Sequence, residues 1–404
     1  LAAFVRAIES SMDRAGTAHT ANDYQRADVY YAIASRLVAR NVLPADALRL
    51  ASKSVPLLNE HDFMAKEEAV HNERQAAAAQ RSPGRRPDPF PRAESEEKWT
   101  GIRASHLSAL GRALLQNGRT ADAERELKAS YALVPVMETG LALATLAEQA
   151  GHLQTALDYA VAAQLTGKMT APEFVQLHAL YQKTHNGTLD GLDALLDRAF
   201  AAKHTNPIPP SRYTPSKART TRTVLAELFT GAACIPCVSV DLSFERALER
   251  YGRNELALLV YHIHAPTSDP YSNFSVEARS AYYGVHGAPT VLLDGLTADV
   301  GEGGGPLAPG IFAKLDPAID AHLNNDPGAA LTVQATRRGD TVAITTRLTK
   351  GPSATTVRLH TALVEITSSY SGENGLRIQP MVVRAMQNKG AGTPLPLADD
   401  AQSW

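Results

Sequence analysis

Cysteine is nearly absent from this chain, with two residues among 404. Such a low count excludes a framework of several disulfides and a zinc site built from four cysteines. Long apolar runs are also lacking, and none approaches the ~20 residues that a transmembrane helix requires. The formal net charge is only −2, so no excess of charge favours binding to nucleic acid or to an anionic membrane. We therefore predict neither a membrane span nor a nucleic-acid partner.

The two cysteines form a single motif, Cys-Ile-Pro-Cys at 234–237. The apolar residues at 223–229 predict a buried strand before it, and the spacing of apolar residues at 238–251 predicts a helix after it. In that setting Cys234 lies at a helix N-terminus, where unpaired N–H groups and the helix dipole stabilise a thiolate. Cys237 is one turn further on and close enough to form a disulfide with it. The motif therefore predicts dithiol chemistry.

Two other uses of the cysteine pair stay open. One is a buried structural disulfide, although so short a loop restrains the unfolded chain little. The other is half of a zinc site, which would require histidine ligands such as His262, His264 or His286. Redox chemistry is the favoured interpretation.

Helices are predicted for residues 1–205, which are rich in Ala and Leu with apolar residues at helical spacing. Within them, a repeat begins with Leu-x2-Leu-Gly-x2-Leu at 107–114 and continues with Ala123. A second copy begins 33 residues later with Gly-x2-Leu-Ala-x2-Ala at 140–147 and continues with Ala156. Small residues at these positions allow the two helices of a hairpin to cross closely.

This repeat resembles the tetratricopeptide family, in which hairpins of two helices recur about every 34 residues. The resemblance is clearest over 104–167. It implies that the helical domain binds a protein partner.

Two proline-rich stretches interrupt the helical pattern. The first, at 75–98, contains four prolines and predicts an exposed loop. The second, at 206–215, predicts the boundary between the helical domain and a domain that carries the cysteines.

Strands and helices alternate over 218–325, which predicts an α/β domain. Besides the strand and helix that flank the cysteines, we expect strands at 255–264 and 290–293 and helices at 275–283 and 311–323. The segments over 328–390 alternate or run apolar in the manner of strands. They predict a small antiparallel β-sandwich, so the chain is predicted to be multidomain.

Two motifs of the α/β domain resemble the thioredoxin-like superfamily. The strand Val-Leu-Ala-Glu-Leu-Phe at 224–229, leading into Cys-x-Pro-Cys, resembles its central strand and redox turn. The segment Tyr-Gly-Val-His-Gly-Ala-Pro-Thr at 283–290 resembles the approach to its cis-proline loop. The resemblance covers about 221–325, a quarter of the chain.

The resemblance implies a role for each matching residue. Cys234 would be the exposed nucleophile and Cys237 the buried resolving thiol, while Pro236 keeps the turn rigid. Pro289, preceded by Ala288, would be a cis proline opposite the cysteines that offers its backbone to a bound peptide.

Glu227 matches a buried acid that exchanges a proton with the resolving sulfur in many thioredoxins. Its spacing to Cys234 is one residue longer than usual, and the alternative is a strand glutamate that faces solvent. The next strand lacks the lysine that thioredoxins often have there, so His262 or His264 would take its electrostatic role. Asp241, one turn after the second cysteine, is expected to face solvent.

The whole arrangement resembles a group of exported bacterial proteins. These proteins place helical repeats before a thioredoxin-like domain with Glu-Leu-Phe-Thr-Gly, found here at 227–231. In these proteins a β-sandwich follows, and three of its sequence stretches are also found here. They are Arg-Leu-His at 358–360, Leu-Val-Glu at 363–365 and Val-Val-Arg at 382–384. The resemblance implies export from the cytoplasm.

The leading hypothesis is a thiol–disulfide oxidoreductase that acts on protein thiols and disulfides and needs no cofactor. Its helical repeats would recruit a client or partner protein. The alternatives are a copper chaperone, with Cys234, Cys237 and His286 as metal ligands, and an interaction scaffold with a regulatory dithiol. The direction of electron transfer stays open.

Overall fold

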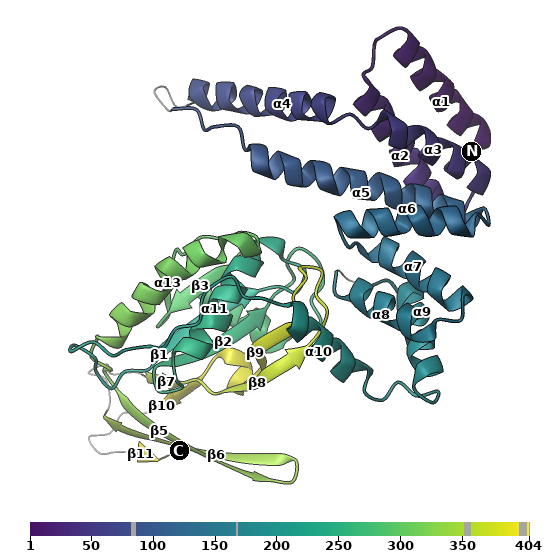
Figure 1. Ribbon diagram of the computed structural model, residues 1–404. Helices are drawn as coiled ribbons and strands as arrows, with labels where there is room; N and C mark the ends of the chain where they lie inside the picture. Colours follow the sequence, from purple (N-terminus) through teal and green to yellow (C-terminus); the bar gives the residue numbers. More distant parts are fainter. Residues whose placement is uncertain (82–85, 167–168, 351–356, 396–401, 404) are drawn as a thin grey trace. The chain divides into compact units, whose positions relative to one another are not determined.

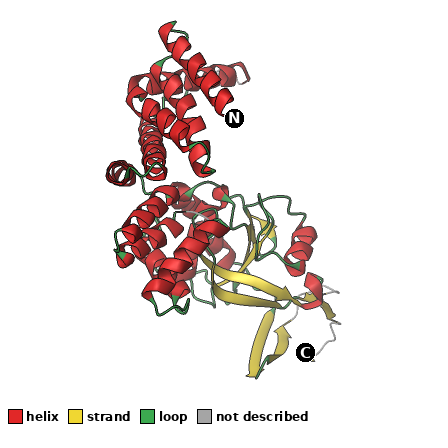
Figure 2. Ribbon diagram, turned by 90° about the vertical axis from the view of Figure 1, so that its right-hand side faces the viewer, coloured by secondary structure: helices red, strands yellow, loops and turns green. Residues whose placement is uncertain are grey.

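The chain consists of two compact units, 1–192 and 193–404. The computed structural model describes residues 1–81, 86–166, 169–350, 357–395 and 402–403. Strands occur only in the second unit of this described part, which is a mixed α/β region with small additional sheets (Figure 1, Figure 2). The division falls ahead of the predicted boundary at 206–215, near the start of α10 (Leu192–Lys203). None of the helices within the described ranges is long and apolar enough to cross a membrane.

The first unit is built from helical hairpins. Its described helices are α1 (Ala2–Thr17), α2 (Asp23–Ala39), α3 (Pro44–Ser54), α4 (Glu60–Arg81), α5 (Arg92–Gln116), α6 (Thr120–Leu133), α7 (Met137–Gln149), α8 (Leu153–Gln164) and α9 (Ala171–Thr184). The pairs α2 with α3, α5 with α6 and α7 with α8 pack against each other. Ala123 and Ala156 are fully buried, as predicted. A Cβ atom at Gly111 would lie 2.6 Å from the Leu127 side chain, so α5 and α6 cross closely.

The first proline-rich stretch is more helical than predicted. Helix α4 continues to Arg81, and α5 begins at Arg92, directly after Pro91. Proline is tolerated at the start of a helix, because the N–H that it lacks would have no helical partner there. Of the predicted loop at 75–98, residues 86–91 are not helical, and residues 82–85 lie outside the described part.

The second unit is organised around one six-stranded sheet with the order β4-β3-β1-β2-β9-β8. The bounds are β1 (Val224–Thr230), β2 (Leu256–His262), β3 (Thr290–Leu293), β4 (Leu296–Thr297), β8 (Ala362–Ser369) and β9 (Ile378–Met386). Strand β1 runs parallel to β2 and antiparallel to β3. The helices α11 (Val238–Arg250) and α13 (Ala308–Leu323) share a core with one face of the sheet. Helix α12 (Phe274–Tyr283) packs against the other face.

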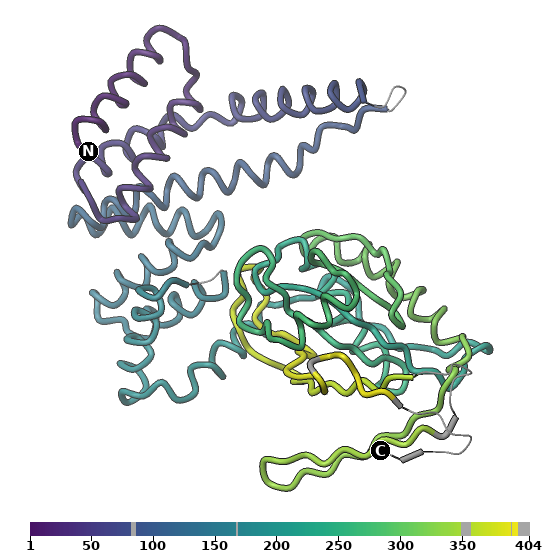
Figure 3. The backbone as a smooth tube through the Cα atoms, turned by 180° about the vertical axis from the view of Figure 1, so that it is seen from behind, coloured from purple at the N-terminus to yellow at the C-terminus, as the bar shows by residue number. Residues whose placement is uncertain are grey.

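The strands predicted for a separate β-sandwich are present but do not form one. Strands β8 and β9 extend the six-stranded sheet, where β9 pairs in parallel with β2. In Figure 3 the yellow tube of this segment lies against the body of the second unit, whereas the green hairpin of 330–350 extends away from it. Strand β9 carries two adjacent valines, Val382 and Val383, that are both fully buried. A strand that is covered on both faces belongs inside a layered α/β sheet rather than on one side of a sandwich.

The other late strands form two small sheets. Strands β5 (Ala330–Arg338) and β6 (Thr341–Lys350) make an antiparallel hairpin, and β11 (Gln402–Ser403) pairs with β6. Strand β7 (Val357–Leu359) pairs with β10 (Thr393–Leu395). Every residue of β5 is exposed, so its alternating pattern does not build a core.

Candidate active site

The two cysteines are joined by a disulfide between the end of β1 and the start of α11. A short 3-10 turn, Ile235–Cys237, connects Cys234 to the helix, and Cys237 is the N-cap residue of α11. Pro236 lies in the first positions of this turn, where its missing N–H leaves no partner unsatisfied. The predicted order of strand, cysteine turn and helix is therefore confirmed.

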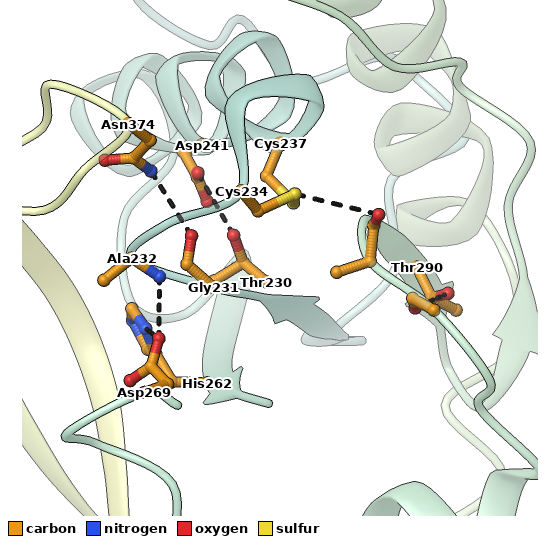
Figure 4. The surroundings of a disulfide bond; sticks show 12 residues. Thr230, Gly231, Ala232, Cys234, Cys237, Asp241, His262, Asp269, Thr290 and Asn374 are labelled. Carbon is orange, nitrogen blue, oxygen red and sulfur yellow. Dashed lines mark hydrogen bonds and ion pairs between the residues drawn. A yellow bond between two sulfur atoms is a disulfide. The ribbon is translucent and has the colours of Figure 1, made fainter. Parts of the chain in front are cut away.

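A cis-peptide loop covers Cys234. The Ala288–Pro289 peptide bond is cis, as predicted, and the Ala288 carbonyl oxygen lies 3.7 Å from the Cys234 Sγ atom (Figure 4). Cys234 is 4% exposed and Cys237 is fully buried. The expectation of an exposed first cysteine is thus wrong for the disulfide form, because this loop lies over the sulfur. The neighbouring Ile235 is 63% exposed and gives the site an apolar rim.

Glu227 does not lie beneath the disulfide. The side chains of Val224, Ala226 and Leu228 point into the core shared with α11 and α13. Side chains alternate between the two faces along a strand, so Glu227 points to the opposite face, which α12 covers, as Phe229 does. The spacing to the cysteine is one residue longer than usual, and a shift of one residue turns a strand side chain to the other face.

Glu227 is instead the centre of a buried polar network. Its Oε1 atom accepts hydrogen bonds from Arg279 Nε at 2.8 Å and from the Tyr261 hydroxyl at 2.9 Å. Its Oε2 atom accepts from Arg279 Nη2 at 3.0 Å and from the Tyr283 hydroxyl at 2.6 Å. Burial and the nearby carboxylate both raise the pKa of Tyr261 and of Tyr283, so both phenols stay protonated donors. The solvent-facing alternative for Glu227 is therefore wrong, because the side chain is fully buried, while the proton-carrier role stays a prediction.

Asp241 takes a position near the disulfide that the sequence analysis did not predict. It follows Cys237 by four residues on α11, so the two side chains lie on the same face of the helix. Its Oδ2 atom accepts a hydrogen bond from the Thr230 hydroxyl at 3.1 Å (Figure 4). Burial raises the pKa of Asp241 to about 7, with a smaller contribution from the Asp269 charge. The spacing of four residues from Cys237 was the available signal.

A cavity of about 300 Å³ adjoins Asp241. Its lining residues come from α10, α11 and the segment around the start of β9: Phe200, Ala201, His204, Asp241, Leu242, Glu245, Leu376, Ile378, Gln379 and Pro380. His204 Nε2 lies 3.1 Å from the Glu245 carboxylate on this cavity. Asp241 therefore borders a mostly apolar cavity, in which His204 and Glu245 are the neighbouring titratable residues.

His262 at the end of β2 and His264 just beyond it contact an aspartate behind the cysteine loop. Asp269 Oδ2 accepts a hydrogen bond from the Ala232 N–H at 2.7 Å and lies 3.2 Å from His262 Nδ1. His264 Nδ1 accepts from the Asp269 N–H at 3.0 Å. Burial opposes ionisation of Asp269, but the hydrogen bonds from His262 and the backbone lower its pKa overall. Both histidines thus support the loop through Asp269.

Within the described ranges, the structure does not bring together a set of ligands for the copper or the zinc alternative. Across the described ranges, no group of three or more His, Cys, Asp or Glu side chains is placed to hold a metal ion. His286 is exposed, and the two sulfurs are bonded to each other.

Comparisons with known proteins give little further information. No protein family matches the sequence, and no curated protein matches it. Among solved structures, the chain is similar to HBP35 of Porphyromonas gingivalis, with 15% identity and a TM-score of 0.36. The similarity covers 47% of this chain and 64% of that chain.

Proposed function

We propose that this protein is a thiol–disulfide oxidoreductase of the thioredoxin-like class that acts on protein disulfides. The observation that carries the proposal is the Cys234–Cys237 disulfide between β1 and α11, facing the cis Ala288–Pro289 peptide. The cis peptide is independent of the cysteines in sequence, and yet its carbonyl oxygen contacts Cys234 Sγ.

The reaction proceeds by two thiolate attacks. In the reducing direction, the Cys234 thiolate attacks a client disulfide, forms a mixed disulfide and releases one client thiolate. Cys237 then attacks Cys234 Sγ, releases the second client thiolate and leaves the protein in the disulfide form. Two electrons pass to the client, and the reverse sequence oxidises a client dithiol.

Asp241 is proposed to accept the proton that Cys237 loses in the second attack. Its place one turn after Cys237 and its hydrogen bond with Thr230 support this role. The adjoining cavity, with His204 and Glu245, offers the proton a path to solvent. Glu227 is not used, because its carboxylate is fully occupied on the other face of β1.

For the helical unit we propose a protein partner, in keeping with its resemblance to tetratricopeptide repeats. A cavity of about 370 Å³ among α2, α5 and α7 supports this proposal, with Tyr31, Arg112 and Glu138 in its lining. Export is proposed on the resemblance alone.

The proposed function is tested with the wild-type protein. We expect it to accelerate the reduction of insulin by dithiothreitol and to exchange its disulfide with glutathione. Free thiols counted before and after reduction should differ by two, because the chain has two cysteines. The oxidoreductase function would be excluded if the protein neither accelerated insulin reduction nor exchanged its disulfide with glutathione.

Asp241→Asn is expected to change the pH dependence of the second attack. In the wild type, the release of client from the mixed disulfide should speed up as pH rises through about 7, where the Asp241 carboxyl loses its proton. The variant should lose this inflection and release client more slowly at pH 8, by roughly 10²-fold. Stopped-flow measurement of client release from pH 5 to 9 checks this, with the exposed Asp340→Asn as the control. An inflection that persists near pH 7 in Asp241→Asn would assign it to another group.

The same variant should also remove a pH dependence of stability. An acid whose pKa is raised in the folded protein binds more protons there than in the unfolded chain. The free energy of unfolding of the wild type therefore contains a term that falls as pH rises from about 4 to about 7. Asp241→Asn should lack this fall, as urea denaturation at both pH values would show.

A further inference from the structure

A segment far from the cysteines in the sequence holds the loop that leads into them. Residues 370–377, between β8 and β9, contact this loop through Asn374 (Figure 4). The Asn374 N–H donates to the Ala232 carbonyl at 3.1 Å, and its Nδ2 atom donates to the Gly231 carbonyl at 3.3 Å. The Gly231 carbonyl also accepts from the Cys234 N–H at 2.9 Å. One carbonyl oxygen thus joins the Asn374 amide to the backbone of the first cysteine.

The approach of the two segments is too close for most side chains. A Cβ atom at Gly372 would lie 2.4 Å from the Ala232 carbonyl oxygen. On the loop itself, a Cβ atom at Gly231 would lie 2.6 Å from the Ala265 carbonyl oxygen. Both clashes are with backbone atoms, which cannot rotate away as a flexible side chain does. The loop is therefore confined between two backbone segments.

Residues 370–377 are themselves held at their C-terminal end by a buried arginine. Arg377 is 5% exposed, and its Nε atom donates to Asp197 Oδ1 on α10 at 2.8 Å. Its Nη2 atom lies 3.3 Å from Asp193 Oδ1, and Nη1 donates to the Ser371 hydroxyl at 3.0 Å. Movement of the segment would break these contacts of the buried guanidinium, so they hold the base of the segment in place.

We propose that Asn374 is a positioning residue that favours the disulfide-closed form of the redox loop. The two hydrogen bonds from Asn374 are made while the sulfurs are bonded. In this proposal, the backbone carrying Cys234 adjusts when the disulfide is reduced, so that the hydrogen bonds from Asn374 are weaker in the dithiol form. Asn374 lies outside the thioredoxin-like stretch at 221–325, so this support is an addition to that part of the chain. The inference deepens the proposed function and rests on it for its catalytic consequence.

The test is Asn374→Ser, compared with the wild type in glutathione buffers. Asn374 Oδ1 accepts from the Leu376 N–H at 3.1 Å, and serine supports such a turn more weakly. The backbone bond to Ala232 is retained, and the donor to Gly231 is lost without a change of charge. In the equilibrium, two glutathione thiols reduce the protein disulfide and become glutathione disulfide. We expect the equilibrium constant to shift towards the dithiol by roughly threefold to tenfold, the value of one ordinary hydrogen bond.

Gly372→Ala provides a second variant that acts on the same contact by a different route. The added Cβ atom pushes the segment away from the Ala232 carbonyl, so the same direction of shift is expected. Gly310→Ala is the matched control, because a Cβ atom at Gly310 meets no atom within 4 Å. A substitution that destabilises both redox forms equally leaves this equilibrium unchanged, so the readout separates positioning from general stability.

The inference and the proposed function are contradicted by different results. Wild-type equilibrium constants in both variants, or a shift towards the disulfide, would overturn the inference. The glutathione equilibrium needs no client protein, so the inference is testable even if the wild type fails to reduce insulin. That failure would instead count against the proposed function.

Discussion

Cys234→Ser is expected to abolish disulfide exchange, whereas Cys237→Ser is expected to accumulate a mixed disulfide with the client. Cys234 is 4% exposed, next to the exposed Ile235, and is the less buried of the two cysteines, so a client disulfide reaches it first. Cys237 has no exposed surface and acts only on the mixed disulfide. Non-reducing electrophoresis followed by mass spectrometry should show the trapped client only with Cys237→Ser.

The reduced wild-type protein provides an independent check of these roles. Brief alkylation at neutral pH should label Cys234 first, because a thiol before a helix N-terminus ionises below the ~8.5 of a free cysteine. Cys237 should react only after unfolding. Equal labelling of the two, or preferential labelling of Cys237, contradicts the assigned roles. Full activity of Cys234→Ser would exclude the enzyme hypothesis.

Glu227→Ala is expected to lower the free energy of unfolding by about 3–5 kcal/mol. The substitution leaves the guanidinium of Arg279, which is 4% exposed, buried without its carboxylate partner. Two tyrosine hydroxyls lose their acceptor as well. Urea denaturation of the wild type and the variant at neutral pH measures this difference.

The control is Glu365→Ala, which removes the partner of Arg384 from an ion pair on the surface of β8 and β9. Both side chains are more than a third exposed, so the expected loss is below about 1 kcal/mol. The folded fraction of Glu227→Ala should exchange disulfides at the wild-type rate. If it keeps its stability but releases client slowly, Glu227 carries the proton after all and the role of Asp241 is wrong.

Most of the predictions that hold concern neighbours in the sequence; the exception is the cis Ala288–Pro289 peptide beside Cys234, which was predicted from a family resemblance. The strand, the cysteine turn and the helix follow one another directly, so residue periodicity and the spacing of 234–237 were sufficient to place them. The burial of Ala123 and Ala156 was predictable for the same reason, because a helical hairpin packs on residues that are close in the chain. The helical ends within 75–98 were missed because the prolines there disfavour helix only at and around themselves.

Predictions of which face a residue occupies depended on details of register. For Glu227, one residue of spacing decides between the face with α11 and the face with α12. Asp241 was treated as a surface residue because its sequence neighbours do not reveal Thr230 at the end of β1. In both cases the sequence showed the type of side chain but not the residues that it contacts.

The sequence by itself determined that this chain has a helical part, a single dithiol motif between a strand and a helix, and a later part rich in strands. Only the tertiary structure decided that β8 and β9 join the central sheet, since their apolar patterns suit any buried sheet equally well. It also decided that Asn374, 143 residues after Gly231, donates a hydrogen bond to the loop before Cys234. The acceptors of Asn374 are backbone carbonyls, which carry almost no residue signal because every residue has one.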